Sequence, residues 1–310
     1  MKSMLDRPPL RLQPPEMVRE RAERVMLALL PAAIMGIYHF GFRSLYVMIV
    51  SVFTCVFSEY AWQRLRGIPI RIGDMSAALT GLLLAMCLSP GVPLWLPIVG
   101  GAFAIIIAKQ MFGGLGQNFV NPPLAAYAFL QASWPVYMAP WIPEGVTGPT
   151  ALAMVRMGGG YGVSIADALI GHGELGSVGE TSVVALLAGA AFLIWKREID
   201  WRQPIIFIGT VFAMTTIFGR AGVPVNPFHE LLLGGLFLGA FFMATDPGTI
   251  PSTGAGRCIF ALGCGLLTSM IRLWGTYAEG IAYSILLMNL TVPIIEDITQ
   301  PRTPKEAEEA

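Results

Sequence analysis

The stretch GLFLGAFFMATDP at residues 235–247 decides the fold, because an apolar run ends abruptly there at an acid and a proline. A similar stretch, GLLLAMCLSP, occupies residues 81–90. Each begins with glycine, continues as an apolar run shorter than the ordinary membrane-spanning helix of about 20 residues, and stops at proline. Short segments of this kind in both halves of a chain are typical of transporters built as inverted repeats with discontinuous helices.

The composition places these segments in a membrane. Of the 310 residues, 55% are hydrophobic and only 13% are charged, and the mean hydropathy is +0.63. A soluble domain would carry about a quarter charged residues. The net charge is zero and no basic cluster with interleaved aromatic residues occurs, which argues against nucleic-acid binding. We therefore expect an all-α polytopic membrane protein whose outer surface contacts lipid.

Ten apolar segments are long enough, or nearly long enough, to cross a bilayer. They lie at residues 25–42, 44–62, 76–90, 94–112, 121–138, 181–196, 203–219, 229–245, 258–274 and 279–296. The third stops at the sequence LSPGVP, which predicts a half-helix or a tight re-entry. The third segment resembles the eighth and the fifth resembles the tenth, so we expect two five-span inverted repeats. The chain then divides into an N-terminal arm (1–24), a first half (25–138), a long loop (139–180), a second half (181–296) and a tail (297–310).

The distribution of basic residues predicts the orientation. Sixteen of the twenty lysines and arginines fall on one side if the spans alternate. The positive-inside rule then places both termini in the cytoplasm and the long loop outside. The polar arm of some 24 residues is too long for the first region of a cleavable signal peptide, so we expect the first apolar run to be a permanent span.

The four cysteines and three histidines give no metal-binding pattern. All four cysteines lie inside apolar segments, none forms a CxxC pair, and the histidines are scattered. We interpret the cysteines as small buried hydrophobic residues and expect this chain to bind no metal.

The long loop contains the polar turn EGVTGPTA, which begins at Glu144. This turn resembles the flavinylation sequence Asp-x-x-Ser/Thr-Gly-Ala-Thr, in which a flavin transferase joins FMN through its phosphate to the last threonine. The matching acceptor is Thr150, with Thr147 and Gly148 in the turn before it, and glycine permits close approach of another backbone. Glu144 replaces the aspartate and keeps its charge, whereas Pro149 replaces alanine and stiffens the turn.

Four further stretches stand in order around this turn. They are AKQMFGGLGQNFVNPPLAAYAFL (108–130), GSVGETS (176–182), LGAFFMATDPGT (238–249) and IRLWGTYAEGIAYSILLMNL (271–290). Together they resemble the D subunit of the Rnf complex and, more distantly, the B subunit of the sodium-pumping NADH:quinone oxidoreductase. The short N-terminal arm and the C-terminal sequence VPIIEDITQPR are more similar to Rnf D.

The resemblance implies a complex in a bacterial or archaeal cytoplasmic membrane that moves electrons between ferredoxin and NAD while translocating sodium ions or protons. This chain would be a flavin-carrying subunit of that oxidoreductase, bound to the other subunits and not catalytic alone. The sequence agrees, because it has neither a dinucleotide fingerprint after a strand nor the ligands of an iron–sulfur cluster. A B-type subunit of the quinone reductase, a small-solute channel or carrier, and a scaffold whose flavin site has decayed through Pro149 remain as alternatives.

Ionisable residues in or beside apolar segments are candidates for an ion path. Asp74 and Asp246 lie at ends of the interrupted segments, where a carboxylate and freed carbonyls bind cations. Glu279 and Glu296 flank the tenth segment and are weaker candidates. We expect the others to lie at the membrane interface with their charged ends in water: Glu59, Lys109, Glu230 and Arg272.

The turn GQNFVN presents the amides of Asn118 and Asn121. Amide donors and acceptors suit an ion or the edge of non-covalently bound riboflavin, which the B subunit of the distant relative is thought to hold. Alternatively, Asn121 caps the helix that Pro122 and Pro123 begin. The predicted topology puts this turn on the cytoplasmic side, away from Thr150.

Overall fold

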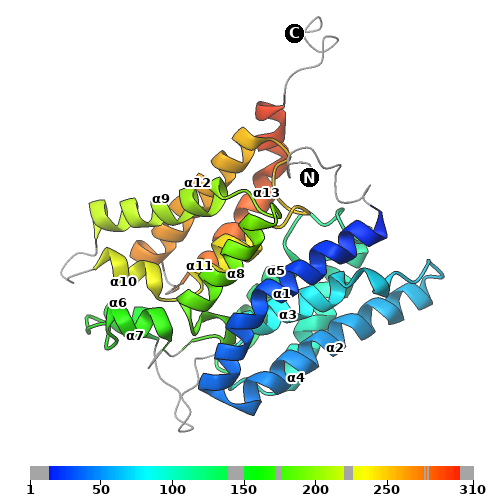
Figure 1. The fold of residues 1–310 in the computed structure, drawn as a ribbon, viewed down its shortest axis with the longest axis horizontal. Helices are drawn as coiled ribbons and strands as arrows, with labels where there is room; N and C mark the ends of the chain where they lie inside the picture. The colour runs from blue at the N-terminus through cyan, green and yellow to red at the C-terminus, as the bar shows by residue number, and fades with distance from the viewer. Residues whose placement is uncertain are drawn as a thin grey trace, which may run out of the picture.

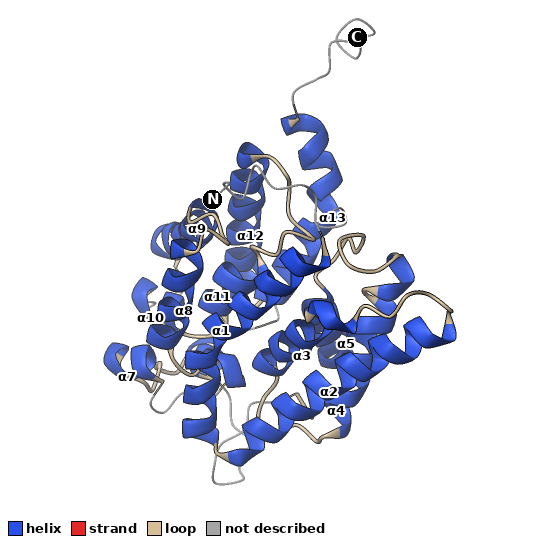
Figure 2. Cartoon of the chain, turned by 45° about the vertical axis from the view of Figure 1, so that its right-hand side comes forward, coloured by secondary structure: helices blue, strands red, loops and turns tan. Residues whose placement is uncertain are grey.

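The computed structural model describes residues 14–138, 150–171, 176–219, 226–275, 277 and 279–300. Over these residues the protein consists of helices and connecting turns, with no β-strand (Figure 2). The predicted all-α fold is therefore confirmed. Helices are expected here, because a backbone in hydrocarbon must satisfy its hydrogen bonds within its own segment.

The first half of the chain forms five helical segments. α1 (Pro15–Phe40) begins with proline at its first position, where the missing backbone donor would have had no partner in the helix. α2 (Phe42–Leu65) follows directly. The remaining elements are α3 (Ser76–Cys87), α4 (Trp95–Ala102) with its π-helical continuation η4 (Phe103–Ile107), α5 (Pro122–Ser133), and the 3₁₀ turns η3 (Ile72–Asp74) and η5 (Gln110–Phe112).

Two short helices of the loop region connect the halves, and five more segments follow. The loop helices are α6 (Ala151–Arg156) and α7 (Ile165–Ile170), with the 3₁₀ turn η6 (Val178–Glu180) after them. The second half contains α8 (Val183–Trp195), α9 (Arg202–Phe218), α10 (Pro227–Leu232), α11 (Leu236–Leu238), the π-helix η7 (Gly239–Met243), α12 (Gly254–Trp274) and α13 (Ile281–Thr299).

Each of the ten predicted segments contains a helix, but only five helices among the described residues are long and apolar enough to cross a membrane by themselves. These are α1, α2, the α4 segment through Phe112, α12 and α13. The interruptions predicted at the third and eighth segments are present. α3 has only 12 residues, and the eighth segment is divided among α10, α11 and η7. The protein is thus a polytopic membrane protein with discontinuous helices.

The two halves meet along α1 with α8 and along α5 with α13 (Figure 1). Within the halves, α2 packs on α3 and α4, and α9 packs on α10 and α12. Gly189 of α8 lets the halves approach, because a Cβ atom there would lie 2.0 Å from the carbonyl oxygen of Ala28 in α1. Small residues at such crossings are typical of helices packed in membranes.

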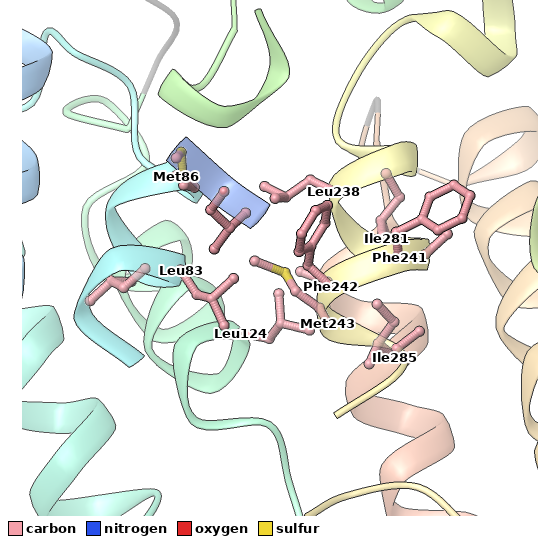
Figure 3. Packing of buried hydrophobic residues seen from close by; sticks show 14 of the residues in the cluster. Leu83, Met86, Leu124, Leu238, Phe241, Phe242, Met243, Ile281 and Ile285 are labelled. Atoms are coloured by element: carbon pink, nitrogen blue, oxygen red, sulfur yellow. The ribbon is translucent and has the colours of Figure 1, made fainter. Parts of the chain in front are cut away.

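The core between the halves is apolar. Figure 3 shows Leu83 and Met86 of α3 facing the π-helix η7, with Phe242 and Met243 pointing into the gap between them. All four side chains are buried. The π-helical turn directs Phe242 and Met243 toward α3 of the other half, whereas Phe241 lies on the side of Ile281. The interrupted segments of both halves therefore form the centre of the molecule.

The outside of the bundle is covered by exposed apolar side chains. On α2 alone these include Phe42, Tyr46, Ile49, Phe53 and Phe57. An apolar surface of this kind, continuous over long helices, agrees with the lipid contact expected from the composition.

Candidate functional site

Thr150 is the residue that caps α6. Its side-chain oxygen accepts a hydrogen bond of 3.2 Å from the backbone N–H of Ala153, and its backbone is extended. The side chain is half-buried. The rest of the predicted flavinylation turn, including Glu144, Thr147, Gly148 and Pro149, lies outside the described residues.

The segment that follows Thr150 is docked on the second half. Ala151 and Leu152 of α6 form a small apolar cluster with Ala168 of α7 and with Leu233, which follows α10. Burial of these side chains fixes α6, and with it the hydroxyl of Thr150, against the membrane-spanning helices.

A small cavity of about 10 Å³ lies beside Thr150. Two carboxylates line it, Glu180 from η6 and Glu279 from the turn before α13, together with the backbone of Gly234. Both glutamates are half-buried. The polar loop and the start of the last helix, far apart in sequence, thus meet at one point.

Arg272 supplies the positive charge at this point. Its guanidinium is 2% exposed and donates to three backbone carbonyls, those of Glu230, Leu233 and Glu279. The last is 3.1 Å from Nε. We call Arg272, Glu180 and Glu279 the Arg272 cluster.

The carboxylates of the Arg272 cluster hold protons more tightly than free glutamate does. Burial and then the negative charge of Glu180 raise the pKa of Glu279 to about 8, although Arg272 opposes the shift. Burial also raises the pKa of Glu180, against hydrogen bonds from Ser177 and the charge of Arg272. Two like charges that share one cation and little water cannot both ionise easily at neutral pH.

A second buried cation lies near the opposite end of α1. Lys109 is 1% exposed, and its Nζ lies 2.9 Å from Oε1 of Glu59 and 2.7 Å from Oγ of Ser76. Ser76 in turn donates to Oδ1 of Asp74 at 2.6 Å. We call these four residues the Lys109 cluster. Oε2 of Glu59 has no hydrogen-bond partner among the described residues, and Glu59 and Asp74 both line a polar cavity of about 300 Å³.

The two clusters are separated by the thickness of the bundle. Arg21, near the start of α1, lines the same cavity as Lys109 and Asp246. Gly36, near the end of α1, contacts Val178 of η6, two residues before Glu180. These two α1 residues are 15 positions apart, which is about 22 Å along an α-helix. The clusters therefore lie toward opposite ends of the helical bundle.

A cavity of about 90 Å³ lies between the halves at the Lys109 end, and we call it the central cavity. Its lining includes Asn118, Asn121 and Asp246. Asn121 caps α5 through its side-chain oxygen and donates to the carbonyl of Met243 in η7. The capping interpretation of Asn121 is therefore correct, and its amide also joins the two halves. Asn118 bonds within its own turn, to Gly116 and Val120.

The structure does not bring the four predicted ion-path residues to one place. Asp74 belongs to the Lys109 cluster, Asp246 lines the central cavity, and Glu279 belongs to the Arg272 cluster. Glu296 lies near the end of α13 and accepts a hydrogen bond of 3.0 Å from the backbone of Ser252. Among the described residues, no group of histidine, cysteine and acidic side chains is arranged to hold a metal ion.

One expectation from the sequence is wrong. The four charged residues expected at the water interface are all buried, with exposures of 1–3%: Glu59, Lys109, Glu230 and Arg272. Each of these side chains has internal partners in place of water, although Oε2 of Glu59 has none among the described residues. The sequence reasoning also assigned no role to Glu180, although this acid stands in the motif GSVGETS directly before an apolar run. The signal that could have identified Glu180 is a charged residue directly before an apolar run in a membrane protein.

Comparison with known proteins places the chain in a family. A sequence model described as the NQR2, RnfD, RnfE family matches residues 12–305. The chain is 45% identical over 295 residues to the D subunit of the proton-translocating ferredoxin:NAD(+) oxidoreductase complex of Clostridium ljungdahlii, covering 89% of this chain and 88% of that protein.

Two further relatives carry related names. The D subunit of the Na(+)-translocating ferredoxin:NAD(+) oxidoreductase complex of Acetobacterium woodii is 45% identical over 286 residues, covering 90% of this chain and 88% of that protein. The D subunit of the ion-translocating oxidoreductase complex of Stutzerimonas stutzeri is 37% identical over 329 residues, covering 92% and 93%. These matches confirm the resemblance inferred from the motifs, and the chain belongs to the NQR2, RnfD, RnfE family.

Proposed function

We propose that this protein is the D subunit of an Rnf-type ferredoxin:NAD oxidoreductase coupled to ion translocation, and that it carries FMN esterified to Thr150. The names of three relatives support the complex and the position of this chain in it, and they favour a D subunit over the B-type alternative. The observation that carries the flavin assignment is the Thr150 hydroxyl, which is half-exposed at the start of a docked helix inside a sequence that resembles the flavinylation motif.

The residues around Thr150 fit a phosphate ester at that hydroxyl. Esterification removes a hydroxyl proton that donates to no described group, and the ester oxygen can still accept from Ala153. The adjoining cavity of about 10 Å³ is too small for an isoalloxazine ring, so the ring would lie outside it. Bound FMN would supply one-electron chemistry, and this chain would hold it in place and set the charge around it.

The arrangement of the helices supports an outward location of Thr150. α6 and α7 lie at the end of the molecule where α1 ends and α13 begins (Figure 1). With the start of α1 on the cytoplasmic side, Thr150 would lie toward the outside, where a flavin transferase acting on the exported loop would reach it. A channel or carrier would not need a flavin attached to Thr150, whereas an electron-transfer subunit would.

The first experiment is mass spectrometry of the chain purified from its native membrane. We expect the peptide that contains Thr150 to carry the mass of FMN minus water, and Thr150→Ala to lose it while the matched control Thr147→Ala keeps it. An unmodified Thr150 in cells that contain the transferase would contradict the flavin assignment and reopen the channel and scaffold alternatives.

A second, non-covalent flavin would be riboflavin in the central cavity beside Asn118 and Asn121. The cavity holds about three water volumes, so its walls would have to move apart to admit a ring system. Denaturing the purified Thr150→Ala protein tests this proposal, because any flavin released from that variant cannot come from the ester. If the denatured variant releases no flavin, the proposal of a non-covalently bound riboflavin is wrong.

The ion path is proposed to run through Asp246, since this carboxylate stands where the eighth segment breaks and lines the central cavity with Asn121 and Lys109. The relatives' names include both protons and sodium ions, so the family does not fix the ion. We expect Asp246→Asn to reduce ion transport per electron in the intact complex, with Asp297→Asn, an exposed carboxylate on α13, as control. Unchanged transport and electron flux in Asp246→Asn would overturn this path.

A further inference from the structure

The Arg272 cluster contains more acid than base. Two carboxylates face one guanidinium, and that guanidinium already donates to three carbonyls. If both carboxylates were ionised, the cluster would carry a net negative charge in a place with little water. A phosphate ester on Thr150 would add a further negative charge beside it.

The geometry at residues 234 and 235 holds the cluster together. A Cβ atom at Gly235 would lie 2.8 Å from Oε1 of Glu180. A Cβ atom at Gly234 would lie 3.4 Å from Cγ of Glu279 and 3.2 Å from Nη2 of Arg272. The backbone of the two glycines therefore passes close to all three charged groups, and residues without side chains leave room for them.

We propose that Glu180 and Glu279 together bind one proton, and that the occupancy of this proton-binding site follows the charge carried by the group on Thr150. The inference rests on the proposed function for its second part, because the group on Thr150 is the FMN proposed above. Its first part, the binding of one proton, concerns only residues of the chain itself.

The proposed step couples the arrival of one electron to the binding of one proton, so the added charges cancel. When the electron carriers of the complex deliver one electron to the group on Thr150, one proton from the water on that face binds to the carboxylate pair. When the electron leaves, the same proton is released. The only bond of the chain that forms and breaks is the O–H bond of the protonated carboxyl. Because the pair lines the cavity beside Thr150, a flavin tethered to that residue would lie within the range over which an electron and a proton attract each other where little water is present.

Other titratable groups near the pair come from several elements. Cys87 of α3, Tyr127 of α5 and Tyr283 of α13 are neutral in their ordinary forms near pH 7. Glu230 of α10 is buried, and its Oε1 lies 3.4 Å from the hydroxyl of Tyr161. Arg272 is the cation of the cluster. The pair of glutamates is therefore the group expected to change charge near neutral pH.

The test is infrared spectroscopy of the purified chain during a pH titration, in which the C=O stretch of a protonated carboxyl reports the proton. In the wild type we expect a band that disappears as the pH rises through about 8, and its absence in Glu279→Gln. Glu180→Gln should move the midpoint of the Glu279 band down by at least about one pH unit, a tenfold loss of proton affinity, since one negative charge is removed. Glu296→Gln, at the other end of α13, is the matched control and should leave the band unchanged.

The variant Thr150→Ala tests the link to the flavin separately from the binding of the proton by Glu180 and Glu279. With FMN present in the wild type, the variant should shift the midpoint down, because the negative ester is absent. An unshifted midpoint in Thr150→Ala, with FMN proven on the wild type, would overturn the link to the flavin. A wild-type spectrum without a titrating band at neutral pH, or a band that survives in folded Glu279→Gln, would overturn the proton-binding site whether or not FMN is bound. If Glu279→Gln fails to fold, an unmoved band in Glu180→Gln would overturn it.

Discussion

Lys109 and Arg272 invite comparison, since each lies at the end of the fourth long segment of its half and each is almost fully buried. Lys109 is matched by one carboxylate at 2.9 Å and a serine hydroxyl. Arg272 donates to three backbone carbonyls, and it has two neighbouring carboxylates rather than one. The same kind of residue thus serves two different purposes.

Lys109 and Arg272 differ in how nearby carboxylates balance their positive charge. Lys109 and Glu59 form a direct ion pair of one charge of each sign, which suits a joint between α2 and the α4 segment, and Asp74 is linked to Lys109 only through Ser76. The Arg272 cluster has an excess of acid and lies beside Thr150, so its charge can change with protonation. We infer that the Lys109 pair mainly stabilises the fold and that the Arg272 cluster mainly serves the chemistry proposed at Thr150.

Breaking the ion pair of Lys109 and Glu59 should have the largest effect on the stability of the fold. Lys109→Met leaves the carboxylate of Glu59 buried without its cation, which should lower the free energy of unfolding by about 3–5 kcal/mol. Thermal unfolding of the purified chain, followed by circular dichroism, measures the loss. The double variant Lys109→Met with Glu59→Leu should recover most of it, because an apolar pair can replace a buried ion pair at little cost.

The exposed pair of Arg19 and Glu23 on α1 supplies the control for this experiment. Its Nε–Oε1 distance is 2.6 Å, yet Arg19 is mostly exposed, so Arg19→Met should barely change the melting temperature. If Lys109→Met is as harmless as Arg19→Met, the Lys109 pair does not stabilise the fold and the comparison with Arg272 fails.

The sequence was sufficient for the broad fold and for part of the site. The apolar runs and the prolines after them located all ten segments, including the break before Asp246, because each is a local property of the chain. Thr150 could be proposed as a flavin acceptor for the same reason, since the sequence that resembles the flavinylation motif is short and continuous. The asparagine cap at Asn121 was one of two interpretations that the residues before Pro122 allowed.

The clusters could not be predicted, because they depend on which helix ends meet in space. Nothing near Lys109 in the sequence shows that Glu59 lies against it, and the lysine was expected to reach water. Glu180 and Glu279 are almost a hundred residues apart and come together only through the docking of α6 and the two glycines after α10. The length and composition of a segment predict that it is in the membrane, but they do not predict the partners of its charged residues.

The measurement that tests the account most directly is the reduction potential of the flavin proposed on Thr150 as a function of pH, in the wild type, Glu279→Gln and Glu59→Gln. Glu279 has a raised pKa, so it is protonated below about pH 8 and becomes negative above it. A negative neighbour opposes the arrival of an electron, so the wild-type potential should fall on passing that pH, by at most ~59 mV per pH unit for one electron and one proton.

The part of the pH dependence that comes from ionisation of Glu279 should disappear in Glu279→Gln, because glutamine cannot ionise. It should persist in Glu59→Gln, because Glu59 lies at the opposite end of the bundle. Glu279→Gln with the wild-type pH dependence, or Glu59→Gln with an equal loss of it, would contradict the assignment of the flavin-linked proton to the Arg272 cluster.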